Sequence, residues 1–287
     1  MTMMSECLSD LLSGNGLMRG ALLASLLAAI ACGTVGSYVV VKRCSYMVGA
    51  ISHSLLGGIG LACFCQYRWP DSRFTPFLGA VLAAVVSALL VTWLANRRSN
   101  RQDTALSAIW TLGTAIGLSF VHAIPGYGID LNSYLFGSIL LVSRQDLFIM
   151  GLLDLGLVVI ILLFHNRFLS FCFNEEGLAL RGVSLWRTGL LLNVLIAVTV
   201  VLLAQIVGLI LCLALLVLPV ATMSLFCRSL NRLMIASAIL CFLTAALGLC
   251  ASYGSNLPTG TLIVEISGGI YLAALLVNHL RRIRIRR

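Results

Sequence analysis

Long apolar segments constrain the fold of this chain more than any other feature. A helix needs about 20 apolar residues to cross a bilayer. Nine segments come close to that length: 18–41, 47–67, 74–95, 105–122, 147–165, 188–204, 206–225, 233–252 and 260–279. The strands of a transmembrane barrel would instead alternate over ~10 residues, and the sequence lacks that pattern. Only 10% of the residues are charged, against roughly 25% in a soluble domain. The sequence therefore predicts an all-α fold, a polytopic transmembrane helical bundle.

We expect nine crossings, with eight and ten as the alternatives, in one transmembrane domain over residues 1–287. No internal repeat of about 20–50 residues is evident, and no low-complexity linker interrupts the chain. The stretch 131–142 is too short to span comfortably and follows the turn AIPGYGID, which favours an interfacial or re-entrant helix. The N-terminal sequence lacks a basic start and a small-residue cleavage site, so we expect no cleaved signal peptide.

The distribution of basic residues predicts the orientation. If the N-terminus lies outside and the nine segments alternate, fifteen of the nineteen Lys and Arg residues fall on the cytoplasmic side. Such an excess is the positive-inside pattern of membrane proteins. It also explains the formal net charge of +9 better than binding to nucleic acid would. We therefore expect an outside N-terminus and a cytoplasmic C-terminus.

Lysine and cysteine usage excludes or disfavours several kinds of site. Lys42 is the only lysine, and no GxxxxGK[ST] phosphate-binding loop surrounds it. The ten cysteines lie mostly inside apolar segments and include no CxxC pair. Packing among helices is therefore favoured over the alternatives, a zinc cage or a disulfide framework.

The longest predicted cytoplasmic loop, 166–187, contains the sequence FNEEGLALRGV, which is typical of a short amphipathic helix. Asn174 is the expected N-cap, with Glu175 and Glu176 in the first turn. The expected apolar contacts come from Phe173, Leu178, Ala179 and Val183. An interfacial helix on lipid headgroups is one interpretation. An acidic first turn suits an anionic membrane surface poorly, which favours a protein docked from the cytoplasm.

Three acidic or histidine residues lie well inside the predicted crossings, away from the segment ends: His53, Asp154 and Glu265. Ionisable groups at membrane depth are candidates for function. Structural roles remain open for each. His53 can be a neutral imidazole bonded to a carbonyl, Asp154 can bond a polar side chain of another helix, and Glu265 can extend toward water.

Small residues surround His53 on its segment, with Gly49 before it and Gly57 and Gly58 after it. Glycines allow neighbouring backbones to approach closely. A histidine beside such a cluster suggests a place where a polar species passes through the membrane, lined in part by these glycines.

Five motifs in order resemble the membrane permease subunits of bacterial zinc/manganese/iron ABC importers. They are GTVGSYVVVKRCSYMVGAISHSLLGGIGLA at 33–62, DTALSAIWTLGTAIGL at 103–118, DLNSYLFGSILLVSRQDL at 130–147, VGLILCLALLVLPVATM at 207–223 and SYGSNLPTGTLIV at 252–264. Together they cover nearly the whole chain.

The resemblance implies a complete transport machine. Two permease chains, identical or related, would form the pathway for a divalent metal ion. Separate ATPase subunits would hydrolyse ATP below them, so this chain itself would not be an enzyme. A periplasmic or lipid-anchored binding protein would deliver the metal. The fold would be similar to that of cobalamin-importer permeases without their first helix. The coupling helix would match Asn174, Glu175, Glu176, Gly177, Leu178, Ala179, Gly182 and Val183.

One position departs from the family pattern. The element SY-x(3)-D-x(3)-H has an aspartate four residues before the histidine, and this chain has Gly49 there. Residues four apart share one face of a helix, so His53 lacks the expected carboxylate partner. Asp154 and Glu265 are the candidates to replace it. The metal stays open, because imidazole suits zinc and oxygen ligands suit manganese.

Two other classes of function remain as alternatives. An ion-gradient-driven secondary metal transporter would be expected to show inverted repeats and broken helices, and no such symmetry is evident. An intramembrane enzyme would need a catalytic motif, and HExxH and GxSxG are absent.

Overall fold

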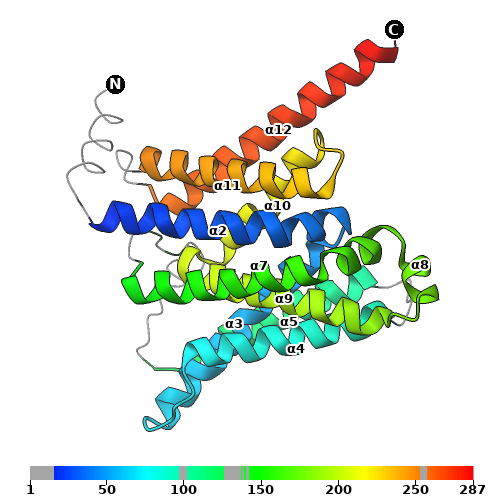
Figure 1. The fold of residues 1–287 in the computed structure, drawn as a ribbon. Coiled ribbons are helices and arrows are strands. Elements are labelled where there is room, and N and C mark those ends of the chain that lie inside the picture. Colours follow the sequence, from blue (N-terminus) through cyan, green and yellow to red (C-terminus); the bar gives the residue numbers. More distant parts are fainter. Residues whose placement is uncertain are drawn as a thin grey trace. The chain divides into compact units, whose positions relative to one another are not determined.

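The predicted apolar segments fold as helices (Figure 1). The computed structural model describes residues 16–96, 102–125, 137, 139, 142–252 and 257–286. The helices are α2 (Gly16–Val41), α3 (Ser45–Arg68), α4 (Pro76–Asn96), α5 (Gln102–His122), α7 (Arg144–Phe173), α8 (Glu175–Leu180), α9 (Leu185–Val207), α10 (Leu209–Ser224), α11 (Leu230–Ser252) and α12 (Thr259–Arg286). Within the described residues no strand occurs, so the all-α prediction is confirmed.

Eight of these helices are long and apolar enough to cross a membrane. The predicted segment 206–225 corresponds to α10, a shorter helix of 16 residues. At ~1.5 Å per residue it is about 24 Å long, less than the ~30 Å of a bilayer's hydrocarbon core. By length and composition, eight helices are candidate crossings, one of the predicted alternatives, and a ninth crossing would have to be the shorter α10.

A sharp break separates α9 from α10. Gly208 takes φ 90°, a conformation that residues with side chains rarely adopt. The backbone at Gly137, also at positive φ, packs against the junction, since an added Cβ there would meet Val207 and Gly208. Most of the predicted short helix at 131–142 lies outside the described residues.

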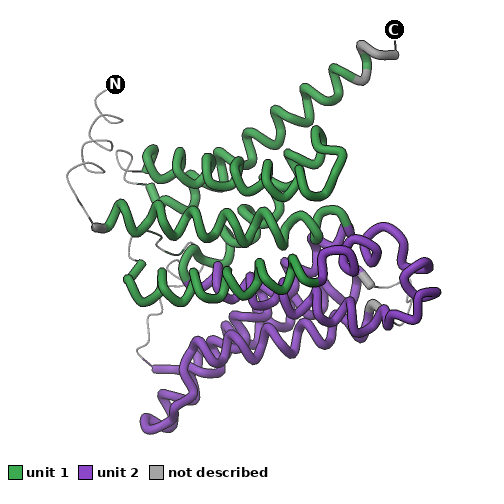
Figure 2. Tube along the Cα trace, in the orientation of Figure 1, with its two compact units in different colours: residues 1–41, 132–163, 206–287 green, residues 42–131, 164–205 purple. Residues whose placement is uncertain are grey.

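The chain divides into two compact units (Figure 2), and each is described by itself. Unit 1 holds Met1–Val41, Asn132–Leu163 and Ile206–Arg287. In it α2 packs against α10 and α11, and α12 packs against both of these helices. Small residues permit the contacts: Gly33 faces Ala238 of α11, and Gly36 faces the Leu216 carbonyl of α10.

Unit 2 holds Lys42–Leu131 and Phe164–Gln205. In it α3 packs against both α4 and α5. Ala50 of α3, Val91 of α4 and Leu106 of α5 form a buried apolar cluster. A polar link connects α9 to α4, where the Asn193 amide donates a 2.8 Å hydrogen bond to Thr92 Oγ1. Satisfying buried polar groups in this way lets them lie among apolar helices.

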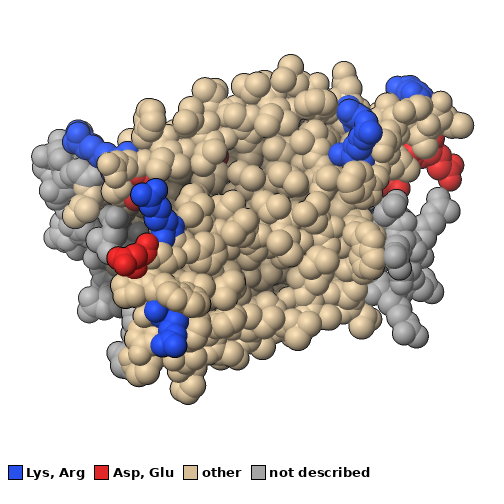
Figure 3. Space-filling view, turned by 90° about the horizontal axis from the view of Figure 1, so that it is seen from below, with Lys and Arg blue, Asp and Glu red and all other residues tan. Residues whose placement is uncertain are grey.

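Charged side chains gather near the edges of the face shown in Figure 3. Among the described residues visible there, the broad area between the edges carries almost no charge. The helix α7 exposes several large apolar side chains, among them Leu152, Leu155 and Leu163. An uncharged band bounded by charge is what a bilayer requires of a protein surface.

Candidate functional site

His53 lies in the first half of α3, with its ring half-buried against α5. The imidazole stacks on the indole of Trp110, with ring centroids 4.4 Å apart and planes inclined by 19°. Thr114, one turn further along α5, places Oγ1 3.4 Å from His53 Nδ1. One face and one edge of the ring are therefore held by α5.

The hydrogen bonds of Thr114 indicate which nitrogen of His53 is available. The Thr114 hydroxyl donates a 2.9 Å bond to the Trp110 carbonyl. Because a hydroxyl has only one proton to donate, its oxygen is left to accept from Nδ1–H of His53. We assign the neutral Nδ1–H tautomer on this basis. Nε2 then keeps its lone pair, as a metal-ligating histidine requires.

The indole of Trp110 also occupies the space beside Gly49. A Cβ at Gly49 would come within 2.7 Å of the Trp110 ring, closer than van der Waals contact allows. An aspartate at this position, as in the resembling family, would require Trp110 to move. The Trp110 ring thus fills the space that an aspartate side chain at position 49 would need.

The other glycines of α3 form helix contacts. Gly57 lies against the Gly113 carbonyl of α5, and Gly58 lies against Gly79 and Ala83 of α4. An added Cβ at Gly57 would lie 3.0 Å from the Gly113 oxygen, and one at Gly58 2.7 Å from Ala83 Cβ. These contacts give Gly57 and Gly58 a packing role, and their lining of a pathway stays a prediction.

Asp154 is deeply buried in α7, with 4% of its surface exposed. Its Oδ2 atom is buried and has no hydrogen-bond partner among the described residues. An unpaired buried carboxyl oxygen is unfavourable, and the hydrogen bond to another helix that would give Asp154 a structural role is not made by Oδ2 among the described residues.

Glu265 is exposed on α12, in unit 1 with Asp154. Within the described part of the chain, no three His, Cys, Asp or Glu side chains lie together in a group that could hold a metal ion. His53 is therefore the best-formed candidate ligand, and the roles of Asp154 and Glu265 stay predictions.

Cys44, at the turn before α3, is a soft atom close to His53 in the sequence. Burial raises the pKa of this thiol to about 12, although nearby Lys42 acts in the opposite direction. Cys44 is therefore a neutral thiol at physiological pH, whereas metal binding requires the thiolate.

The helix predicted in the long loop is α8, and its capping is as expected. The Asn174 side chain accepts a 2.8 Å bond from the Gly177 N–H, and Glu175 and Glu176 stand in the first turn. Of the four predicted apolar contacts only Leu178 is buried, at 4% exposure. Phe173 and Ala179 are exposed and Val183 is half-buried, so the helix keeps an apolar outer surface.

A glycine ends α8. Gly182 takes φ 73° and donates a 2.9 Å bond to the Ala179 carbonyl, while Val183 donates to the Leu178 carbonyl. This pair of bonds with a left-handed glycine is a Schellman motif. The six-residue helix is thus fixed at both ends.

An ion pair holds α8 to the turn between α2 and α3. Lys42 Nζ lies 2.8 Å from Glu175 Oε1 and also 3.1 Å from the centroid of the Phe171 ring. The turn that leads into the His53 helix is therefore connected directly to α8.

Sequence reasoning missed several of these residues. Trp110 and Thr114 carried no signal, because their link to His53 crosses two helices. Leu180 is the most exposed large apolar residue of α8, at 88%. Its position two residues beyond the buried Leu178, on the other side of the helix, could have identified it.

Comparison with known proteins decides the family. The family model described as the ABC 3 transport family matches residues 15–278. The chain belongs to this family. The chain is therefore a multi-pass helical permease of the metal-transport ABC type, which supports an ABC importer over the secondary-transporter alternative.

Relatives and a solved structure agree with the family. A probable metal transport system membrane protein of Chlamydia trachomatis is 38% identical, over 91% of this chain and 89% of that protein. The manganese import system permease protein ScaB of Streptococcus parasanguinis is 30% identical, over 91% and 90%. The structure of PsaBC from Streptococcus pneumoniae in complex with Fab is similar with a TM-score of 0.81 and 26% identity, covering 94% of this chain and 95% of that one.

Proposed function

We propose that this chain is the membrane-spanning subunit of an importer that moves a divalent transition metal ion, manganese, zinc or iron, into the cytoplasm. The whole chain acts as one permease domain in the bacterial inner membrane. Its N-terminus lies outside and its C-terminus inside, an arrangement in which α10 crosses the membrane as a ninth helix. The family match over residues 15–278 carries this proposal.

In this proposal His53 is the metal ligand on the pathway. Its Nε2 is free of the contacts that hold Nδ1 and the ring face. Asp154 supplies a buried carboxyl oxygen without a partner among the described residues, and Glu265 a carboxylate on the exposed face of α12. Gly49, Gly57 and Gly58 let the neighbouring helices approach α3 closely around His53. Weak coordination by few ligands suits transport, because an ion that enters must also leave.

The partner proteins follow from the same proposal. A separate ATPase subunit hydrolyses ATP and binds this chain at α8. The residues that bind it are Asn174, Glu175, Glu176, Gly177, Leu178, Ala179, Gly182 and Val183. Of these residues, Leu178 and the capping residues Asn174 and Gly182 stabilise the helix, and the exposed side chains contact the ATPase. A periplasmic or lipid-anchored protein delivers the metal, and a second permease chain, identical or related, completes the pathway.

Uptake of radioactive manganese and zinc tests the proposal. Cells that carry this chain should accumulate metal, and deletion of the neighbouring ATPase gene should abolish the uptake. Uptake that continues without the ATPase but stops on collapse of the ion gradient would refute an ABC importer. Competition between unlabelled manganese, zinc and iron identifies the metal: relatives named for manganese favour manganese, and imidazole ligation favours zinc.

A further inference from the structure

A basic pocket lies on the inner side of α8, within unit 2. Its volume is about 450 Å³, within the ~300–1,000 Å³ range of small-molecule sites. It is lined by Asn166, Arg167, Ser170, Leu178, Arg181, Gly182, Val183, Ser184 and Arg187. Three arginines line it and, among these described residues, no carboxylate does.

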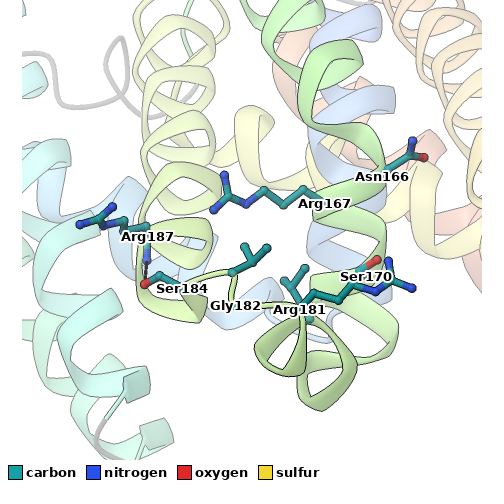
Figure 4. Close-up of a pocket in the computed structure, with 9 residues that line it drawn as sticks. Asn166, Arg167, Ser170, Arg181, Gly182, Ser184 and Arg187 are labelled. Atoms are coloured by element: carbon teal, nitrogen blue, oxygen red, sulfur yellow. Dashed lines mark hydrogen bonds between the residues drawn. The ribbon is translucent and has the colours of Figure 1, made fainter.

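Arg167 is the central group of the pocket. Its side chain extends from α7 toward α9, over the turn that contains Gly182 and Ser184 (Figure 4). Its Nε atom is buried and has no hydrogen-bond partner among the described residues. Because a buried N–H donor without an acceptor is unfavourable, this position is set up to receive an anion.

The surroundings of Arg167 provide further donors and space. Arg181 turns toward Ser170 on one side, and Arg187 stands at the start of α9 on the other (Figure 4). Ser184 Oγ accepts from the Arg187 backbone N–H at 3.4 Å, which leaves its own proton to donate. A Cβ added at Gly182 would meet no atom within 4 Å, so the turn stays open. Arginine and hydroxyl groups are the usual ligands of phosphate.

The pocket is at the depth of lipid headgroups. From Leu147 to Asn166, α7 extends about 29 Å at ~1.5 Å per residue, which matches the ~30 Å hydrocarbon core. The exposed apolar side chains of α7 follow one another at helical spacing: Phe148, Leu152, Leu155, Val159, Leu162 and Leu163. Asn166 and Ser170 continue that face, so the lipid-facing stripe ends at the pocket.

The pocket lies beside the buried part of α8 and not beside its most exposed side chain. Leu178, the buried residue of α8, lines it, whereas Leu180 points outward with 88% exposure. Glu175, at the start of α8, is occupied by Lys42.

We propose that this pocket binds the phosphate group of an anionic phospholipid, centred on Arg167. Basic pockets at the cytoplasmic ends of membrane helices bind such headgroups. The lipid then fixes the end of α7 and the α8–α9 turn against the membrane surface. This site is separate from the metal pathway, and it adjoins the proposed ATPase-binding residues, of which Leu178, Gly182 and Val183 also line the pocket.

Lipid retention by the purified full-length chain tests the proposal. Native mass spectrometry in detergent should show preferential retention of phosphatidylglycerol over phosphatidylcholine. Arg167→Gln should reduce that preference about fivefold, the effect of one cation near an anionic headgroup. Arg181→Gln should reduce it in the same direction, and Arg167→Lys should retain part of it. Arg228→Gln, an exposed arginine outside the pocket, is the matched control and should leave it unchanged.

Thermal unfolding distinguishes the sources of phosphate. Phosphatidylglycerol should raise the Tm of the wild-type chain and not that of Arg167→Gln. Equal protection by inorganic phosphate would overturn a lipid site. Wild-type lipid preference in Arg167→Gln would overturn the role of Arg167. If Arg167→Gln weakened binding of the ATPase while lipid preference stayed intact, the pocket would hold an acidic side chain of that partner, and the lipid proposal would be wrong.

Discussion

Lys42 and Glu175 join two segments that are 133 residues apart, with Lys42 Nζ 2.8 Å from Glu175 Oε1. Both side chains reach solvent, at 23% and 54% exposure, and exposed ion pairs contribute only about 0.2–1 kcal/mol. The pair therefore serves mainly to set the position of α8 relative to the α2–α3 turn.

Exchange of the two charges tests this connection. Lys42→Glu or Glu175→Lys alone should weaken the coupling of ATP hydrolysis to metal uptake in proteoliposomes. The double variant should recover most of it, because the pair re-forms with reversed sign. Global stability should change by less than about 1 kcal/mol in each case. A double variant no better than the single ones would show that the ion pair is incidental.

Leu180→Arg should reduce binding of the ATPase subunit without unfolding the permease. The side chain is 88% exposed, and surface substitutions typically change stability by less than about 0.5 kcal/mol. Co-purification of the ATPase with the membrane chain measures the effect. Leu257→Arg, at an exposed leucine before α12, is the matched control. Equal co-purification of both variants would contradict the assignment of α8 as the docking helix.

His53→Ala should lower metal uptake while the chain still inserts and binds its ATPase. Thr114→Val removes the group that holds Nδ1 and leaves the ring in place. Loss of an outer partner of a metal-ligating histidine typically costs about 10–100-fold in affinity or activity. Thr114→Val should therefore raise the metal concentration for half-maximal uptake, and Thr114→Ser should restore it. Wild-type uptake by His53→Ala would leave the histidine with a structural role only.

Gly49→Asp alone should destabilise the chain, and adding Trp110→Ala should restore its stability. The new Cβ would lie within 2.7 Å of the Trp110 ring, and overpacking of this kind costs about 1–3 kcal/mol. Gly49→Asp with Trp110→Ala should regain stability and, by adding an oxygen ligand, shift uptake toward manganese. Unfolding of both variants in detergent, with Trp110→Ala as the reference, measures the coupling. Additive effects would mean that the two positions are independent.

Gly58→Ala should destabilise unit 2 by about 1–3 kcal/mol, because the added methyl group meets Ala83 and the Gly79 backbone. Gly151→Ala in α7 is the matched control, since nothing lies within 4 Å of that position. Its effect should be neutral or slightly stabilising, as alanine favours helix more than glycine does. Similar denaturation midpoints for the two variants would argue against close packing of α3 on α4.

The sequence predicted what depends on local pattern. The apolar segments became helices, and the Asn174 cap with its two glutamates was recognisable because capping involves residues only three apart. The break between α9 and α10 was predicted at residue 205, three residues before Gly208, since apolar residues continue across it.

What could not be predicted depends on contacts between distant segments. His53 and Thr114 are 61 residues apart, and Lys42 and Glu175 are 133 apart. The sequence shows that position 49 is glycine where the family pattern has aspartate. It does not show that Trp110 lies beside Gly49, because the glycines of α3 and α5 set the helix register that brings these two residues together. No local rule identifies such a pair.

The short helix α10 has a consequence for how this protein responds to its membrane. The side chains of α10 are largely buried, including Leu209, Leu211, Leu215 and Leu216. The helix therefore contacts other helices and little lipid. A lipid-exposed helix of this length would suffer hydrophobic mismatch and would thin the bilayer or tilt with its thickness. Sheltered by α2, α11 and α12, α10 is insulated from that force, and changes in acyl-chain length should act on the outer helices and leave α10 in place.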